Sequence, residues 1–179
     1  IMNFRNAAFL ASEDGIQVDY VKVDDDIAVN DSLYTVGRRG VAGTVFVHKL
    51  AGAAAEQGMT LTQVKAVAEK AAANVKSIGF ALTSCTVPAK GTPTFELGED
   101  EIEYGVGIHG EPGIRREPMA QAHELAGRMA EALCGELGLQ NGGGRVAVLV
   151  NGFGATPLME LYLFNHEIAR EMARRGITV

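Results

Sequence analysis

The chain has 179 residues, which is long enough for one large domain or two small ones with a substantial core. A hydrophobic content of 47%, with 22 glycines and 6% aromatic residues, is typical of a soluble α/β protein and excludes a disordered or fibrous one. The net charge of -6 argues against nucleic acid as a partner, and without an apolar run of ~18 residues or a signal peptide we expect a cytoplasmic protein with no membrane partner.

The first half of the chain predicts three helices and one strand. Apolar residues at helical spacing predict a helix over residues 4–11, and alternating apolar and polar residues predict a strand over residues 16–26. A glycine-punctuated loop that starts near Tyr34 leads into a helix of small residues over about 44–57. Thr60 has the capping-box spacing to a glutamine three residues later, which predicts the start of the next helix.

From about residue 76 the sequence changes to strands and turns. Residues 77–88 and 94–110 predict strands, and the segment Gly98-Glu99-Asp100 marks a turn. The acidic residues between positions 99 and 103 lie in this predicted hairpin, so we interpret them as a solvated surface and not as a metal site.

Two more helices and a strand follow. Pro118 suits the first turn of a helix whose apolar stripe runs to Leu137. Residues 146–150 predict an apolar strand, and a glycine loop then leads to a helix with Thr156 as N-cap and Pro157 at its first position. The alternation of strands and helices favours an α/β architecture.

We therefore predict an α/β fold of two α/β subdomains, with mixed sheets flanked by helices. Residues 1–77 are expected to form the C-terminal part of a first domain, and residues 78–179 most of a second. The opening helix has no lead-in loop, and the last residues begin a strand that does not develop. We expect the chain to be a fragment of a longer polypeptide.

Three glycine-rich stretches invite comparison with nucleotide-binding motifs. The GxGxxG spacing within "YGVGIHGEPG" is followed by Glu-Pro-Gly and not by an apolar helix. The stretch "GRRGVAG" lacks the Gly-Lys-Ser/Thr of a Walker A motif, and its Arg38 and Arg39 are interpreted as partners of the aspartates at 24–26. The stretch "NGFGATP" joins a strand to a helix N-terminus, so it is either a tightly packed turn or an anion site.

The two cysteines and three of the four histidines are predicted to be structural or surface residues. Cys85 and Cys134 are far apart and have no metal-ligand spacing, so we interpret them as reduced structural thiols. His48, His123 and His166 lie within predicted helices.

His109 has a different setting. It follows the end of a predicted strand and is flanked by Gly107 and Gly110, whose missing Cβ atoms allow a ligand or another chain to approach the ring. From this context alone, a functional and a structural histidine remain alternatives.

Three separated blocks carry a resemblance to a known family. They are "GRRGVAGTVFVHKLAGAAAEQG", "CTVPAKGTPTFELGEDEIEYGVGIHGEPG" and "VLVNGFGATPLMELY". In order and over nearly the whole chain, these blocks resemble the substrate-binding K subunit or K domain of dihydroxyacetone kinases. The resemblance implies a kinase of glycerol metabolism and a two-domain, homodimeric K unit. It also implies that His109 is the catalytic residue, forming a covalent hemiaminal with the carbonyl carbon of dihydroxyacetone, with Gly107 and Gly110 beside the substrate.

Such chemistry suits a small ketone. A triose has only about six non-hydrogen atoms, and at a ceiling near -1.5 kcal/mol per atom non-covalent contacts discriminate poorly between it and glycerol. Only a carbonyl accepts attack by a neutral imidazole nitrogen, so covalent addition selects ketones over polyols.

The resemblance further implies that the chain itself holds no cofactor and no metal. Mg-ATP, or ADP rephosphorylated by a phosphotransferase relay, is expected on a partner L subunit or domain. The family's acid/base histidine and aspartate come from the earlier half of the K unit and would precede Ile1. An alternative from another class is a dihydroxyacetone-sensing coactivator of a transcription regulator, and those earlier residues would separate the two.

Overall fold

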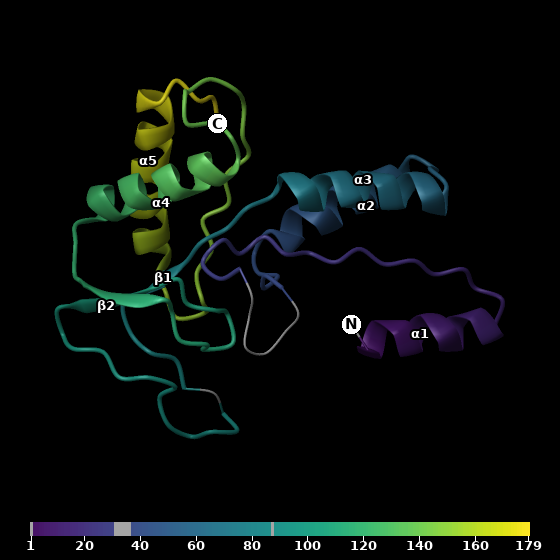
Figure 1. Ribbon diagram of the computed structural model, residues 1–179, viewed down its shortest axis with the longest axis horizontal. Coiled ribbons are helices and arrows are strands. Elements are labelled where there is room, and N and C mark those ends of the chain that lie inside the picture. The colour runs from purple at the N-terminus through teal and green to yellow at the C-terminus, as the bar shows by residue number, and fades with distance from the viewer. Residues whose placement is uncertain (1, 31–36, 87) are drawn as a thin grey trace.

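The computed structural model describes residues 2–30, 37–86 and 88–179. The start of the predicted loop at Tyr34 and residue 87 of the predicted strand 77–88 lie outside these ranges. The described residues form five helices and three strands (Figure 1). In chain order these are α1 (Met2–Glu13), α2 (Thr44–Glu56), α3 (Leu61–Asn74), β1 (Phe80–Ala81), β2 (Glu101–Tyr104), β3 (Arg115–Pro118), α4 (Ala122–Glu136) and α5 (Leu158–Arg174).

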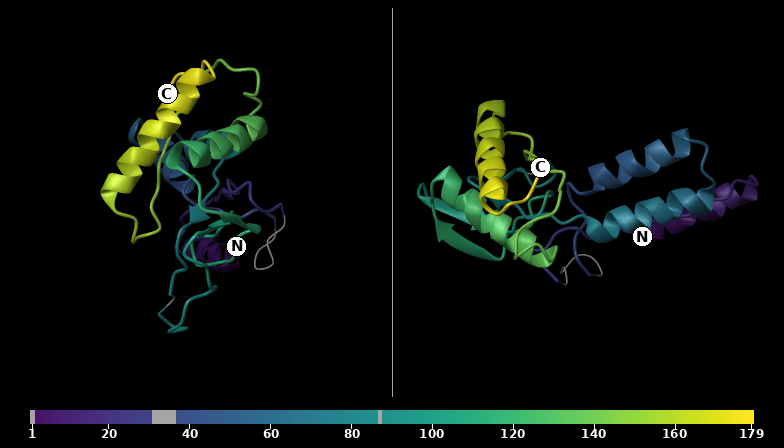
Figure 2. Two further views of the ribbon diagram at one scale, coloured as in Figure 1. Left: turned by 90° about the vertical axis from the view of Figure 1, so that its left-hand side faces the viewer. Right: turned by 90° about the horizontal axis from the view of Figure 1, so that it is seen from above.

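Helices α2 and α3 form a close pair, which Figure 2 shows side by side in the right-hand view. Val47, Ala68 and Ala72 are buried between them, and Val21 and Val23 from the preceding extended segment pack on this cluster. Small side chains let the helix axes approach closely, as the alanine content predicts. The predicted capping box is confirmed, since Thr60 is the N-cap of α3 and pairs reciprocally with Gln63.

Helices α4 and α5 cross each other (Figure 1) and pack around a second cluster of buried side chains. This cluster contains Ala126, Ala130, Cys134, Ile168, Met172 and Ile177. Its helical members recur at a spacing of four residues on one face of each helix, so the amphipathic pattern places them in the core, and Ile177 joins them from the segment after α5. The α/β class is thus confirmed, while the division into domains at residue 77 stays a prediction.

The sheet differs from the expected one. Strands β1, β2 and β3 pair in that order, and both pairings are antiparallel. Only short central parts of the predicted strands 77–88 and 94–110 form ladders. Parallel pairing in the described ranges is confined to isolated bridges, so the mixed sheets that the sequence predicts are not formed.

Two segments predicted as strands are extended without forming ladders. At the end of residues 16–26, Asp26 forms an isolated parallel bridge with Ser77, and next to residues 146–150 Arg145 forms one with Thr178. Both strand predictions are therefore wrong for the described structure. Alternation favours an extended backbone, but a strand also needs a hydrogen-bonded neighbour along its length.

Two predicted helix starts are also wrong. Pro118 ends β3 opposite Glu101, at a sheet edge where the missing N–H of proline is tolerated, and α4 begins four residues later. Helix α5 begins at Leu158 with Pro157 as its N-cap, so Thr156 is not the capping residue. The Thr156 side chain instead lies against Gly152.

Candidate functional site

His109 lies in the connection between β2 and β3, called here the histidine loop (residues 105–114). Its two ends are tied to the sheet, because the N–H of Gly105 donates to the carbonyl of Gly79 at 2.7 Å and the N–H of Ile114 to that of Tyr104 at 2.8 Å. The His109 side chain is 78% exposed. The histidine loop therefore presents an imidazole to solvent from a base that is fixed by main-chain hydrogen bonds.

Glu111 folds back onto His109. Its Oε2 accepts a hydrogen bond from the main-chain N–H of His109 at 2.9 Å, and its Oε1 lies 3.3 Å from the ring nitrogen Nδ1. Burial raises the pKa of Glu111, but hydrogen bonds from its own N–H and from His109 outweigh burial and lower the pKa overall. Glu111 is thus a carboxylate that orients the imidazole.

Gly107 and Gly110 lie against protein side chains. A Cβ on Gly107 would be 2.7 Å from Cδ of Glu111 and 2.8 Å from Nη1 of Arg39. A Cβ on Gly110, which has a φ of 81°, would be 2.5 Å from Sγ of Cys85. Both glycines are therefore needed for packing of the histidine loop, and their contact with a substrate stays a prediction.

Arg39 links the histidine loop to the first half of the chain. Its guanidinium pairs with Asp26 at 2.7 Å, and Nη2 also donates to the carbonyl of Gly105 at 2.7 Å. Burial raises the pKa of Asp26. The hydrogen bond from the N–H of Ala28 and the charge of Arg39 lower this pKa, but the effect of burial is larger. The pairing predicted for Arg39 is confirmed, whereas Arg38 pairs with Glu136 and not with the aspartates.

Two main-chain N–H groups of the "GRRGVAG" stretch donate hydrogen bonds to a side chain of the protein. The carboxylate of Asp25, which is fully buried, accepts hydrogen bonds from the N–H groups of Val41 and Gly43, each at 2.8 Å. These N–H groups precede α2, where a bound phosphate would need them. An internal carboxylate thus takes the place of an external anion.

The "NGFGATP" stretch packs against the start of the sheet. A Cβ on Gly79 would lie 3.0 Å from Cζ of Phe153, so the aromatic ring covers Gly79. Gly154 has a φ of 102°, a conformation that glycine adopts readily. The contact of Phe153 with Gly79 supports the packed-turn interpretation, and the alternative of an anion site stays a prediction.

The acidic residues near β2 are only partly solvated. Glu103 is buried, and its carboxylate accepts hydrogen bonds from the N–H of Gly113 at 2.9 Å and from Arg116 at 3.2 Å. The prediction of a solvated surface is therefore wrong at this residue, because β2 turns it inward under the histidine loop. Among the described residues, no group of three or more His, Cys, Asp or Glu side chains could hold a metal ion.

Of the remaining histidines and the cysteines, only Cys85 lies beside the histidine loop in the described structure. His48, His123 and His166 are exposed on α2, α4 and α5. Cys134 is in the core, and burial raises the pKa of its thiol. Cys85 is an exposed free thiol, but it lies beside Gly110 in the histidine loop.

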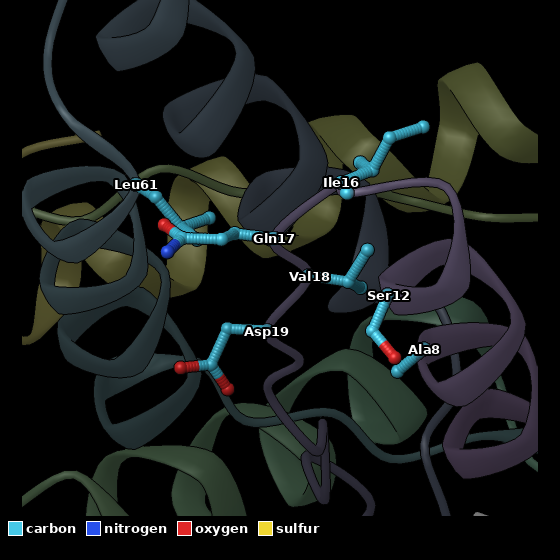
Figure 3. A pocket seen from close by; sticks show the side chains of 8 residues that line it. Ala8, Ser12, Ile16, Gln17, Val18, Asp19 and Leu61 are labelled. Atoms are coloured by element: carbon cyan, nitrogen blue, oxygen red, sulfur yellow. The ribbon is translucent and has the colours of Figure 1, made fainter.

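Two surface hollows of the described residues have linings that do not include His109. One hollow has a volume of about 530 Å³. Figure 3 shows its lining residues, which come from α1, the segment after it and Leu61. A second hollow of about 390 Å³ reaches one end of the histidine loop at Ile114 and is also lined by Tyr104 at the end of β2. We take the histidine loop as the candidate site because it joins an exposed nucleophile to an orienting carboxylate. No helix in the described ranges is long and apolar enough to cross a membrane.

The fold and the site together define an α/β protein that presents an oriented imidazole on a glycine-rich loop between two strands. The chain belongs to the Dak1 domain family, whose match spans residues 1–179.

Relatives of known name agree with this family. The chain is 54% identical, over 179 residues, to the PTS-dependent dihydroxyacetone kinase 1, dihydroxyacetone-binding subunit DhaK, of Listeria innocua, covering 100% of this chain and 54% of the relative. It is 49% identical to the corresponding Lactococcus lactis subunit, again covering 100% and 54%. A solved structure of a dihydroxyacetone kinase operon co-activator matches with a TM-score of 0.87 and 35% identity over 98% of this chain and 54% of that one. The chain thus spans about half the length of these relatives.

Proposed function

We propose that this chain is the ketone-binding part of a dihydroxyacetone kinase that draws its phosphoryl group from the phosphotransferase system. The observation that carries the proposal is the 54% identity to the Listeria innocua subunit along the whole chain. In the structure, the exposed and oriented imidazole of His109 supports the proposal. The proposal concerns the full-length protein, of which this chain provides the histidine loop.

In this function His109 holds the substrate covalently. The unprotonated ring nitrogen forms a bond to the carbonyl carbon, the π electron pair of the C=O bond moves to oxygen, that oxygen takes up a proton from water, and the other ring nitrogen gives its proton to water. The resulting hemiaminal leaves the two terminal hydroxyl groups of dihydroxyacetone free to accept a phosphoryl group. Gly107 and Gly110 are proposed to lie beside the bound ketone.

Nucleotide and magnesium are proposed to bind a partner L subunit or domain. The main-chain N–H groups before α2 are already bonded to Asp25, and the "NGFGATP" turn is packed by Phe153. The first of these stretches therefore does not offer the N–H cradle that a phosphate group requires. We further propose that the full-length protein is a homodimer.

The decisive test is intact-mass spectrometry of the full-length protein with dihydroxyacetone. We expect one ligand to add per chain, and His109→Ala to abolish the addition because the nucleophile is gone. His123→Ala, which removes an exposed histidine on α4, should leave the addition unchanged. Glycerol should give no adduct, since it has no carbonyl group.

Contrary results are equally clear. An adduct that persists in His109→Ala places the covalent site elsewhere. An adduct lost in both variants points to a general loss of structure, which circular dichroism of His109→Ala would reveal.

A second candidate function is that of a dihydroxyacetone-sensing coactivator of a transcription regulator. The match to the co-activator structure, with its TM-score of 0.87, favours it. Its sequence identity of 35% is lower than the 54% to the kinase subunit, which is why we place it second. Formation of dihydroxyacetone phosphate by the full-length protein with an L subunit and phosphotransferase components separates the two, because a pure sensor forms none.

A further inference from the structure

We propose that Glu111 is a positioning residue that keeps the proton of the His109 imidazole on Nδ1, so that the lone pair of Nε2 is the one that attacks the ketone. The inference deepens the proposed function and rests on it for the attack, but the placement of the proton can be tested without any ligand.

The geometry of the carboxylate supports this role. One oxygen of Glu111 holds the main-chain N–H of His109 at 2.9 Å while the other lies 3.3 Å from Nδ1 of the same residue. Both oxygens thus act on one residue, which fixes the ring relative to its own backbone. The His109 side chain is 78% exposed and that of Glu111 only 21%, so the carboxylate lies on the protein side of the ring.

The chemistry of the pair decides the tautomer. An ionised carboxylate has only acceptor atoms, so a ring nitrogen that faces it at hydrogen-bond distance carries the proton. In neutral imidazole only one nitrogen is protonated, and the other keeps a lone pair. With the proton on Nδ1, the nucleophile is Nε2. The same arrangement occurs where a carboxylate orients a metal-binding histidine.

Glu111 gains and loses no atom during the addition, and its negative charge stabilises the ring. The lone pair of Nε2 forms the C–N bond, the C=O π pair moves to oxygen, and water supplies the proton that oxygen takes up. The ring is then an imidazolium, whose positive charge lies next to the carboxylate of Glu111. Loss of the Nδ1 proton to water gives the neutral hemiaminal, so the protein gains the mass of one ketone and nothing else.

The surroundings of the carboxylate are specific to this role. Gly107 has no Cβ, and one would lie 2.7 Å from Cδ of Glu111, so only glycine lets the carboxylate reach the ring. Nη1 of Arg39 would lie 2.8 Å from the same Cβ, which places a guanidinium on that side of the histidine loop. The other side is formed by Cys85 and Thr94, which pack on Gly110. Glu111 is the carboxylate that contacts the ring among the described residues.

The first experiment reads the tautomer directly. Full-length protein labelled with ¹⁵N-histidine is studied by NMR at about pH 8, where an ordinary histidine with a pKa near 6.5 is neutral. The ring resonances of His109 are assigned by their loss in His109→Ala. We expect the proton on Nδ1 in the ligand-free protein.

The second experiment removes the charge with little change of shape. In Glu111→Gln the amide oxygen can still accept the main-chain N–H of His109, but the preference for a protonated Nδ1 is reduced. We expect a mixture of tautomers and a weakening of dihydroxyacetone addition by about 10–100-fold, as for other carboxylates that orient a reactive histidine. Glu99→Gln, at an exposed position in the turn before β2, makes the same chemical change and should alter neither quantity.

The outcomes separate this inference from the proposed function. A proton on Nε2 in the wild type overturns the inference, whether or not the variants fold. An unchanged tautomer and unchanged addition in Glu111→Gln overturn it as well. A proton on Nδ1 with no adduct in the wild type overturns the proposed function of His109 while supporting the role of Glu111 in placing the proton.

Discussion

Arg38 and Arg39 are neighbours in the chain but lie in very different environments. Arg39 is 8% exposed and its partner Asp26 only 1%, so their ion pair is removed from water. The pair of Arg38 with Glu136 lies at the surface, with side-chain exposures of 23% and 34%. Because a buried charge that loses its partner cannot regain hydration, the two pairs should differ greatly in their contribution to stability.

We therefore predict that Arg39→Ala lowers the free energy of unfolding by about 3–5 kcal/mol, since it leaves the buried Asp26 unpaired. It also removes the donor to the carbonyl of Gly105. Arg38→Ala is the matched control and should cost roughly 0.2–1 kcal/mol. Urea unfolding of the full-length variants near neutral pH measures both values, and equal losses would contradict this view of Arg39.

At the level of single residues, the sequence singled out His109 as a candidate, whose role stays a prediction, but did not single out Glu111. His109 could be singled out because its flanking glycines are visible in the sequence itself. The role of Glu111 depends on the chain folding back after two residues, so that its carboxylate meets both the backbone and the ring of His109. The pattern of a carboxylate two residues after the histidine and just before Pro-Gly was the available signal. The burial of Glu103 was missed because its environment is created by a neighbouring loop.

Helices were predicted better than strands. A helix is specified by contacts within a few residues, so the periodicity and the Thr60 capping box located α2 and α3 closely. A strand depends on partners far along the chain, and the extended residues before Asp26 form only a single bridge, with Ser77. The helix start predicted at Pro118 was wrong because this proline lies in an edge strand of the sheet.

The capping box of α3 predicts how much a substitution at its N-cap destabilises the protein. Thr60 is the N-cap of α3 and its side chain accepts the N–H of Gln63. Thr60→Ala should lower the free energy of unfolding by about 0.5–2 kcal/mol. Thr62→Ala changes the same residue type two positions further, at an exposed site inside the helix, and should stay within roughly 0.5 kcal/mol of the wild type. Thermal or urea unfolding tests both, and a smaller effect at Thr60 than at Thr62 would be inconsistent with the cap.

The described residues form two helix pairs, with α1 apart from both and with the sheet and the histidine loop beside the second pair (Figure 1). The histidine loop is tied to the first half of the chain by Arg39 and to the sheet by main-chain hydrogen bonds. Loops that resemble nucleotide-binding stretches are used for packing between these parts. The use of the N–H groups before α2 within the protein supports the proposal that the phosphoryl donor binds another protein.

Calorimetry on the full-length protein can measure whether it binds the phosphoryl donor or only the substrate. We expect no micromolar binding of Mg-ATP, because the N–H groups that precede α2 are bonded to Asp25. Dihydroxyacetone serves as the positive control and should bind in the same preparation. Micromolar Mg-ATP binding in the absence of an L subunit would place the donor site on this protein.

The bridge between Asp26 and Ser77 also constrains the order of folding. The N–H of Ser77 donates to the carbonyl of Asp25 at 2.8 Å, and the N–H of Ile27 to that of Ser77 at 2.9 Å, so these bonds enclose α2 and α3 completely. Contacts between α2 and α3 close a short loop, whereas the bridge closes a long one. The entropy cost of closing the long loop is lower if the helix pair has already formed. We expect the helix pair to belong to the folding nucleus, so that a weakened cap at Thr60 slows folding more than it speeds unfolding.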